Sequence, residues 1–194
     1  YFDGWQEVEE RDASDAVLRQ YVYGNYIDEV WTLDDRSGGI TLEQLNDSTG
    51  GQRHFYHCNT LYSIYALTDE AGAVAEAYQY NAYGTPTVWN GAGADAAFFS
   101  DDDVVSATAN GAPTSATGNA RFYTGRYWVT ANAAISGIYY YRHRYYQPNV
   151  GRFVGRDPVG HDDAAANLYA YVVSNSVNLS DPMGLEVQLC CRRT

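Results

Sequence analysis

Lysine is absent from the 194-residue chain, so its positive charge comes from 12 arginines alone. These arginines stand against 24 acidic residues, which gives a formal net charge of −12. Proteins that bind nucleic acid or anionic membrane surfaces depend on clustered cations that attract phosphate. The composition therefore argues against both classes. Arginine stacks on aromatic rings and pairs with carboxylates, so it suits a structural role in a chain rich in both.

Cysteine is scarce as well. The chain has three cysteines, Cys58, Cys190 and Cys191. An odd number gives no closed disulfide framework. The adjacent Cys190 and Cys191 are poor partners for each other, because a bridge between neighbours is strained. The cysteines therefore do not indicate a compartment.

Long apolar runs are missing. No stretch approaches the roughly 20 residues that a membrane-spanning helix needs, and no signal-peptide pattern is present. The chain begins in the middle of a pattern, at Tyr1, without an initiating methionine. We therefore predict no membrane span, and we expect the sequence to be part of a longer polypeptide.

Tyrosine and glycine are abundant, with 19 and 18 copies. Tyrosine favours strands and combines an apolar ring with a hydroxyl group that stays hydrated. Glycine permits the tight turns that join short strands. This combination predicts an all-β architecture made of many short strands.

The first half of the chain reads as a series of hairpins. Polar turn residues separate runs that favour strands. The predicted strands cover residues 17–23, 26–33, 53–56, 63–68 and 73–80. Residues 34–52 and 90–119 are polar or rich in small residues, so both are predicted to be loops.

The second half contains the densest aromatic stretch. Residues 138–146 read as one long strand, in which alternation places Tyr139, Tyr141, His143 and Tyr145 on one face. Ladders of aromatic and arginine side chains across neighbouring strands would stabilise such a sheet. An aromatic platform that binds carbohydrate, or an adhesive surface, is the functional alternative.

Several motifs occur in a fixed order toward the end of the chain. They are Tyr145-Tyr146-Gln147-Pro148-Asn149-Val150-Gly151-Arg152-Phe153, Asp157-Pro158-Val159-Gly160, Asn167-Leu168-Tyr169-Ala170-Tyr171 and Asp181-Pro182-Met183-Gly184-Leu185. The sequence pattern of a YD repeat is resembled by an earlier segment, Tyr78-Gln79-Tyr80-Asn81-Ala82-Tyr83-Gly84. The chain resembles the repeat region and core of Rhs and YD-repeat proteins. Gln147 departs from the family pattern, which usually has Asp there.

The resemblance implies a spiral of antiparallel YD-repeat hairpins that forms part of a β-shell and ends in an inward-turning core. It implies a division into hairpins at 1–89, a flexible insertion at 90–119, an Rhs-associated core at 120–185 and a C-terminal tail at 186–194. Each hairpin cannot bury its apolar face alone, so neighbours stack.

The resemblance also implies a site. The matching core of the family is similar to an aspartyl self-protease that cuts after the final D-P-x-G-L. Carried over residue by residue, Asp157 and Asp181 are the carboxylates and Arg156 is the nearby cation. The scissile bond is then Leu185–Glu186. The structural alternative is two turns without chemistry, because Asp-Pro opens turns and a glycine two residues later completes them.

Other candidate sites are weaker. His54, His57 and Cys58 form an H-x-x-H-C cluster, but a tetrahedral zinc site needs a fourth donor, and on a strand the two histidines face opposite sides. Residues 101–103 are three aspartates without the alternating spacing of a calcium loop. His143 and His161 have no evident partner, and no nucleophile elbow is present. We predict no metal and no cofactor.

Three functions follow as hypotheses. The chain is a structural or encapsulating module of a secreted or cell-surface protein, an intramolecular aspartyl protease, or an adhesive surface. Exposed sheet edges invite pairing, so the expected partners are upstream repeats of its own polypeptide or further copies of itself. An enclosed C-terminal peptide is a further expected partner.

Overall fold

The computed structural model describes residues 1–37, 39–41, 43–44, 52–95, 97–109, 111–130, 136–160 and 167–189. Cys190, Cys191 and His161, which the sequence singled out, lie outside these ranges. Within the ranges, no helix is both long enough and apolar enough to cross a membrane.

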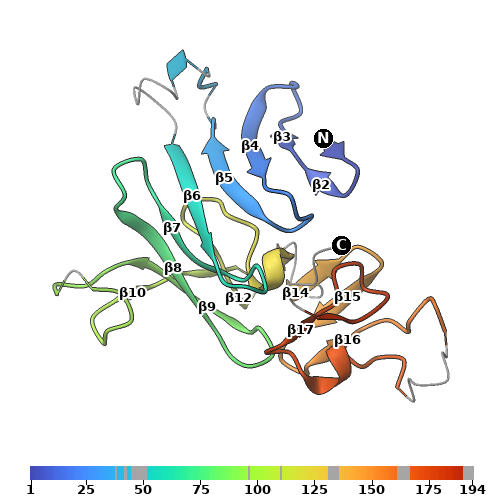
Figure 1. Ribbon diagram of the computed structural model, residues 1–194. Coiled ribbons are helices and arrows are strands. Elements are labelled where there is room, and N and C mark those ends of the chain that lie inside the picture. Colours follow the sequence, from blue (N-terminus) through green and yellow to red (C-terminus); the bar gives the residue numbers. More distant parts are fainter. Residues whose placement is uncertain are drawn as a thin grey trace.

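One antiparallel sheet dominates the described part of the chain, and each of its eight strands pairs with its neighbour in sequence (Figure 1). We call it the large sheet. Its strands are β3 (Glu9–Arg11), β4 (Val17–Tyr23), β5 (Val30–Asp35), β6 (Gln52–Cys58), β7 (Ile64–Thr68), β8 (Val74–Tyr80), β9 (Pro86–Gly91) and β10 (Val104–Val105). The predicted all-β fold built from antiparallel hairpins is confirmed, and β4 has the predicted bounds.

A single turn design recurs along the large sheet. In each copy an Asp or Asn side chain accepts hydrogen bonds from the backbone N–H groups two and four residues later, at positions 12, 59, 69 and 81. The residue three positions on has a positive φ, and it is Asp15, Tyr62, Gly72 or Gly84. Short polar side chains and left-handed backbone thus fix where each hairpin bends.

A smaller sheet, which we call the core sheet, follows in the chain. Its strands are β13 (Tyr127–Thr130), β14 (Ser136–Tyr141), β15 (Arg144–Gln147) and β16 (Arg152–Phe153). The prediction of one long strand over 138–146 is wrong, because the chain reverses at Arg142 and His143. Arg142 has a φ of 65°. The reversal places Tyr146 in the core together with Tyr139 and Tyr141 and leaves Tyr145 exposed. The prediction had placed Tyr145 on the same face as Tyr139 and Tyr141.

Shorter elements complete the fold. They are β1 (Phe2–Asp3), β2 (Gln6–Glu7), β11 (Thr108–Ala109), β12 (Ala112–Pro113), β17 (Leu179–Ser180), β18 (Gln188–Leu189) and two 3-10 turns, η1 (Tyr123–Gly125) and η2 (Val172–Ser174). The segment 90–119, predicted as a loop, contains β10, β11 and β12. Within the predicted loop 34–52, residues 43 and 44 are helical, and Thr41 and Gln44 form a reciprocal capping box.

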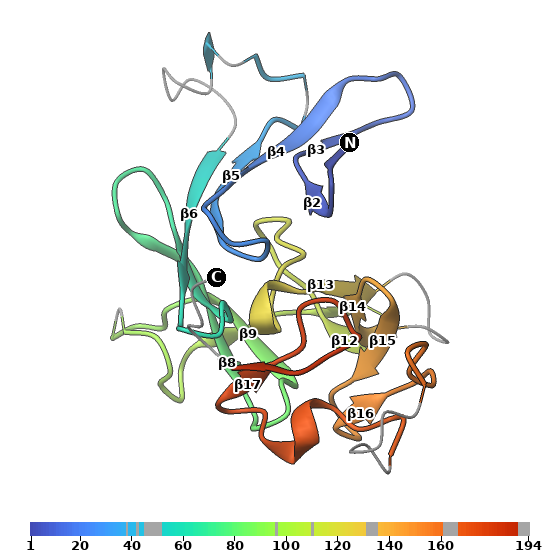
Figure 2. The same ribbon diagram turned by 45° about the vertical axis from the view of Figure 1, so that its right-hand side comes forward.

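The two sheets share one hydrophobic core (Figure 2). The large sheet contributes aliphatic residues such as Leu33 and Leu67, and the core sheet contributes mainly rings. Tyr139 donates a hydrogen bond to the carbonyl of Gly84 at 2.8 Å, and Tyr146 donates to the carbonyl of Tyr83 at 2.8 Å. The turn between β8 and β9 is thereby tied to the core sheet, which carries the predicted site at its other end.

Candidate functional site

The final D-P-x-G-L segment folds around its own aspartate. Asp181 is buried, and its Oδ1 accepts the N–H of Leu185 at 2.9 Å and the N–H of Glu186 at 3.2 Å. Gly184 has a φ of +69°, which L side chains rarely adopt. The Asp181 carboxyl therefore contacts the nitrogen of the predicted scissile bond, Leu185–Glu186.

The turn between β14 and β15 holds this segment from the other side. Three consecutive side chains of the turn donate hydrogen bonds to three consecutive carbonyls. The pairs are Arg142 to Pro182, His143 Nδ1 to Met183 at 2.8 Å, and Arg144 Nε to Gly184 at 2.6 Å. The backbone of residues 182–184 is thus fixed at every peptide unit.

One guanidinium connects the two predicted carboxylates. Arg144 Nη1 lies 2.9 Å from Asp157 Oδ2, and Arg144 Nη2 lies 3.0 Å from Asp181 Oδ2. The guanidinium stacks on the ring of Phe153, with its carbon 3.6 Å from the ring centroid. Charge-assisted pairs of this kind are strong and directional. The structure therefore brings Asp157 and Asp181 together, through a shared cation.

Asp157 also organises its own turn. Its Oδ1 accepts the N–H of Val159 at 3.0 Å, and its carbonyl accepts the N–H of Gly160 at 3.2 Å. Its backbone N–H donates to the carbonyl of Leu168 at 3.0 Å. The Asp157 side chain remains 18% exposed, against 2% for Asp181. Water can therefore reach Asp157 more easily than Asp181.

The environment of Asp181 shifts its ionisation toward the protonated form, relative to an exposed aspartate. Burial raises the pKa of the Asp181 carboxyl above its ordinary value, and this effect exceeds the lowering by the Leu185 N–H and by Arg144. A buried acid beside a more exposed carboxylate is an arrangement that can divide acid and base roles.

The cation of the site is Arg144, and sequence reasoning missed it. Arg156 was the predicted cation, but its side chain is exposed, and within the described residues it forms no ion pair with Asp157 or Asp181. The sequence pattern gives Arg144 no role in this site, because the turn at Arg142 and His143 contains no Gly, Asn or Asp to signal it.

A second buried ion cluster lies next to the first. Asp28, in the connection between β4 and β5, is 4% exposed and pairs with Arg126 and with Arg142, the latter at 2.8 Å. Burial raises the pKa of Asp28 to about 7, and the coulombic effect of Arg126 opposes this rise. Because Arg142 also binds the Pro182 carbonyl, the cluster connects the β4–β5 connection to the predicted cleavage segment.

The His and Asp clusters that the sequence analysis weighed as metal sites do not assemble as metal ligands would. His54 is buried, whereas His57 is exposed and bonds Thr68, so the two histidines face opposite sides as expected. Among the described residues, the group with metal-ligand spacing is Asp95, Asp102 and Asp103. The carboxylate oxygens of Asp102 and Asp103 already accept hydrogen bonds from the backbone N–H groups of Gly93, Ala94 and Ser100. The prediction that the chain binds no metal stays a prediction.

The chain is similar to segments of much longer proteins. The tRNA3(Ser)-specific nuclease WapA of Bacillus spizizenii is 28% identical over 185 residues, which cover 94% of this chain and 6% of the relative. The double-stranded DNA deaminase toxin A of Burkholderia cenocepacia is 32% identical over 130 residues, covering 67% of this chain and 7% of the relative. No family model matches the chain.

The fold matches a solved structure as well. The crystal structure of TcdB2-TccC3 superposes with a TM-score of 0.58 at 23% identity, covering 90% of this chain and 7% of that one. With the recurring Asp/Asn turns and the paired D-P-x-G segments, these similarities define an all-β repeat protein. The chain belongs to the Rhs/YD-repeat family. It spans only 6% to 7% of the length of these relatives.

Proposed function

We propose that the chain is a structural module that forms part of the wall of an encapsulating β-shell, in a secreted or cell-surface Rhs/YD-repeat protein. The observation that supports this proposal is the sequential order of the large sheet, which ends at β3 and β10. Among the described residues, Tyr1 bonds the backbone of Glu9 beside β3, whereas β10 pairs with β9 alone. Edges of this kind template further strands. Upstream repeats of the same polypeptide, or further copies of the chain, would extend the wall at these edges. The toxin names of the relatives support the proposed setting.

The edge strand β10 offers a direct test. Val104 and Val105 are 58% and 57% exposed on it, and apolar residues on an open edge favour association. Sedimentation velocity should show association that increases with concentration, and Val105→Lys should weaken it. Val22→Lys is the matched control, because Val22 is 50% exposed but lies on the internal strand β4. A chain that stays monomeric at all concentrations contradicts extension of the wall by further copies of the chain.

A second candidate function is a single self-cleavage at Leu185–Glu186, favoured by the contact between Asp181 Oδ1 and the Glu186 nitrogen at 3.2 Å. In the proposed step, water adds to the Leu185 carbonyl carbon while the Asp157 carboxylate takes a proton from the water. The carbon–nitrogen bond breaks as protonated Asp181 gives its proton to the nitrogen. The products are a Leu185 carboxylate and a Glu186 amine.

The intact mass of the denatured protein tests this step. Denaturation is needed because β18, beyond the cut, pairs with β17 and would hold the released peptide. We expect the wild type to lose residues 186–194, and Asp157→Asn, Asp181→Asn and Arg144→Gln to keep them. Asp69→Asn is the control, since Asp69 also accepts two backbone N–H groups in a turn but pairs with no arginine among the described residues. Full-length mass in the wild type would refute self-cleavage and leave the wall proposal untouched.

A further inference from the structure

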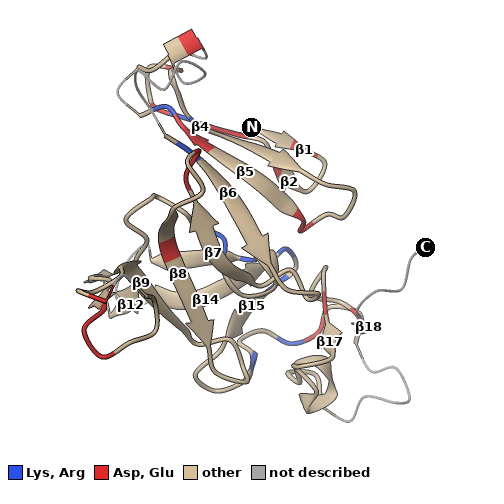
Figure 3. Cartoon of the chain, turned by 60° about the vertical axis from the view of Figure 1, so that its left-hand side comes forward, with Lys and Arg blue, Asp and Glu red and all other residues tan. Residues whose placement is uncertain are grey.

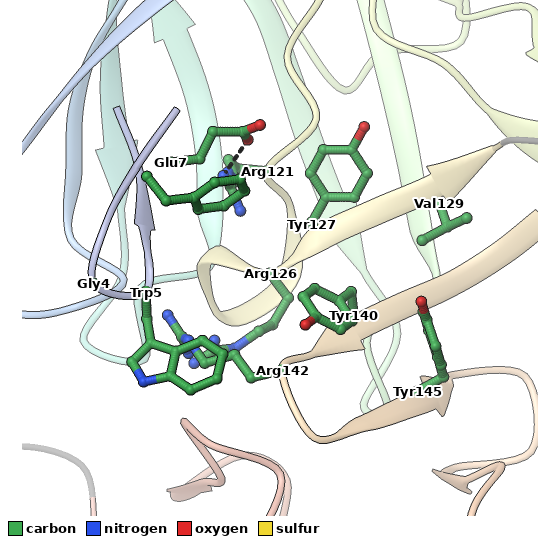
Figure 4. A pocket seen from close by; sticks show the side chains of 11 residues that line it. Gly4, Trp5, Glu7, Arg121, Arg126, Tyr127, Val129, Tyr140, Arg142 and Tyr145 are labelled. Atoms are coloured by element: carbon green, nitrogen blue, oxygen red, sulfur yellow. Dashed lines mark hydrogen bonds and ion pairs between the residues drawn. The ribbon is translucent and has the colours of Figure 1, made fainter. Parts of the chain in front are cut away.

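A pocket of about 510 Å³ lies on the outer face of the core sheet (Figure 4), and it shares Arg142 with the residues that clamp the D-P-x-G-L segment. Its floor is a row of side chains across three strands, Tyr127, Tyr140 and Tyr145, which are 37%, 38% and 47% exposed. Trp5, from the turn between β1 and β2, forms one wall and is 49% exposed. Large rings that remain this open are available to a ligand.

The pocket also gathers positive charge. Arg121, Arg126 and Arg142 line it, while Glu7 is its one lining carboxylate among the described residues. Asp28 lies behind Arg126 and Arg142, so three cations meet two carboxylates and the local formal charge is +1. This local positive charge contrasts with the net charge of the chain, which is −12. The acidic residues lie on many separate strands and loops (Figure 3).

The arginines retain unused hydrogen-bonding capacity. Arg126 and Arg142 have side chains only 4% and 7% exposed. The Nε–H donors of Arg121, Arg126 and Arg142 have no acceptor within the described part of the chain. Buried donors without an acceptor are costly. Small local adjustments that admit a carboxylate would satisfy them.

We propose that this pocket binds an acidic polypeptide segment that carries an aromatic side chain, with the carboxylates toward the arginines and the ring on the Tyr140 and Tyr145 face. Trp, Tyr and Arg are the residues that dominate binding energy at protein interfaces, and they make up most of this lining. The site lies on a sheet face, so recognition runs through side chains and not through strand addition at an edge. The proposal is independent of self-cleavage.

A synthetic peptide with the sequence of residues 97–103, Ala-Phe-Phe-Ser-Asp-Asp-Asp, is a suitable probe because it combines rings with carboxylates. Its version with three Asn in place of Asp is the matched control. We expect the acidic peptide to bind the full chain and the Asn peptide to bind at least tenfold more weakly, measured by titration calorimetry. Equal binding of the two peptides, or no binding of either, overturns the proposal.

Variants locate the binding to the pocket. Trp5→Ala, Tyr140→Ala and Arg121→Gln should each weaken the binding of the acidic peptide about tenfold. The controls are Trp31→Ala, an exposed tryptophan on the large sheet, and Arg53→Gln, which pairs with Asp34 there. Circular dichroism checks that each variant is folded. Losses as large in the controls as in the pocket variants, or tighter binding of inorganic phosphate than of the peptide, would overturn the assignment.

Discussion

Asp28 is a buried residue whose ionisation is coupled to folding. Its carboxyl is buried between Arg126 and Arg142, and burial raises its pKa from 3.8 to about 7. Between these two values the folded chain holds a proton that the unfolded chain has released. The stability that comes from this raised pKa is therefore present at low pH and is lost as the pH rises toward 7.

We predict that the free energy of unfolding of the wild type falls between pH 4 and pH 7 relative to that of Asp28→Asn, by up to about 1.4 kcal/mol per pH unit. Asparagine imitates the protonated acid, so the variant lacks this dependence. Both proteins keep Asp181 and His54, whose contributions cancel in the comparison. Urea denaturation across this range measures the difference, and a relative slope of opposite sign would mean that the two arginines outweigh burial.

Arg144 is the second residue on which the site depends. It is buried with the ion pairs to Asp157 and Asp181, and its removal leaves two carboxylates without a counter-ion. We expect Arg144→Gln to lower the free energy of unfolding by roughly 3–5 kcal/mol. Arg156→Gln is the control and should change stability by less than about 0.5 kcal/mol, because Arg156 is exposed. Equal effects of the two substitutions would show that the ion pairs of Arg144 add no stability beyond that of an exposed arginine.

At the scale of elements, the two D-P-x-G turns look alike in sequence but differ in surroundings. Gly160 and Gly184 both have positive φ, at 86° and 69°. A Cβ on Gly160 would meet open space, whereas a Cβ on Gly184 would lie 2.6 Å from the carbonyl oxygen of Tyr141. The second turn therefore needs glycine for space as well as for conformation.

We predict that Gly160→Ala lowers the free energy of unfolding by about 1 kcal/mol, the cost of left-handed backbone alone. Gly184→Ala should lower it by roughly 3 kcal/mol, because the backbone of β14 must also move. Thermal or urea denaturation of both variants measures the difference. Similar losses would show that residues 181–185 are not held tightly against β14.

Strands and turns of the large sheet were predictable from sequence, and the core sheet was less so. Asp and Asn turn residues mark the bends between β6 and β9, so β6, β7 and β8 were predicted to within a few residues, whereas β9 was not predicted. The sequence around the reversal at Arg142 contains no such turn residue, because the reversal is held by tertiary hydrogen bonds to residues 182–183. Arg144 could not be assigned for the same reason. Asp157 and Asp181 were singled out from the family resemblance of two local D-P-x-G motifs, and the structure places both beside Arg144.

At the scale of the whole molecule, the two sheets depend on one core. Tyr139 is fully buried between them and contacts the rings of Tyr123, Trp128 and Tyr146. A shared core makes unfolding cooperative. Neither sheet has a separate interior that would survive the loss of the other.

We therefore expect a single unfolding transition in urea, with the same midpoint by tryptophan fluorescence and by circular dichroism. Tyr139→Ala should lower the free energy of unfolding by roughly 3–5 kcal/mol and keep the two probes coincident. Trp128, buried in the core sheet, and Trp31, exposed on the large sheet, report on the two parts. Two separate transitions would contradict a common core.

The sequential pairing of the large sheet also bears on how the chain can be assembled in time. Every strand from β4 to β10 pairs with the strand that precedes it in the sequence, so loop closure stays short and folding can proceed in step with the emergence of the chain. The core sheet comes later, and its contacts with Gly84 and Tyr83 require β8 and β9. The Asp181 turn requires the turn between β14 and β15, whose side chains bind the carbonyls of residues 182–184.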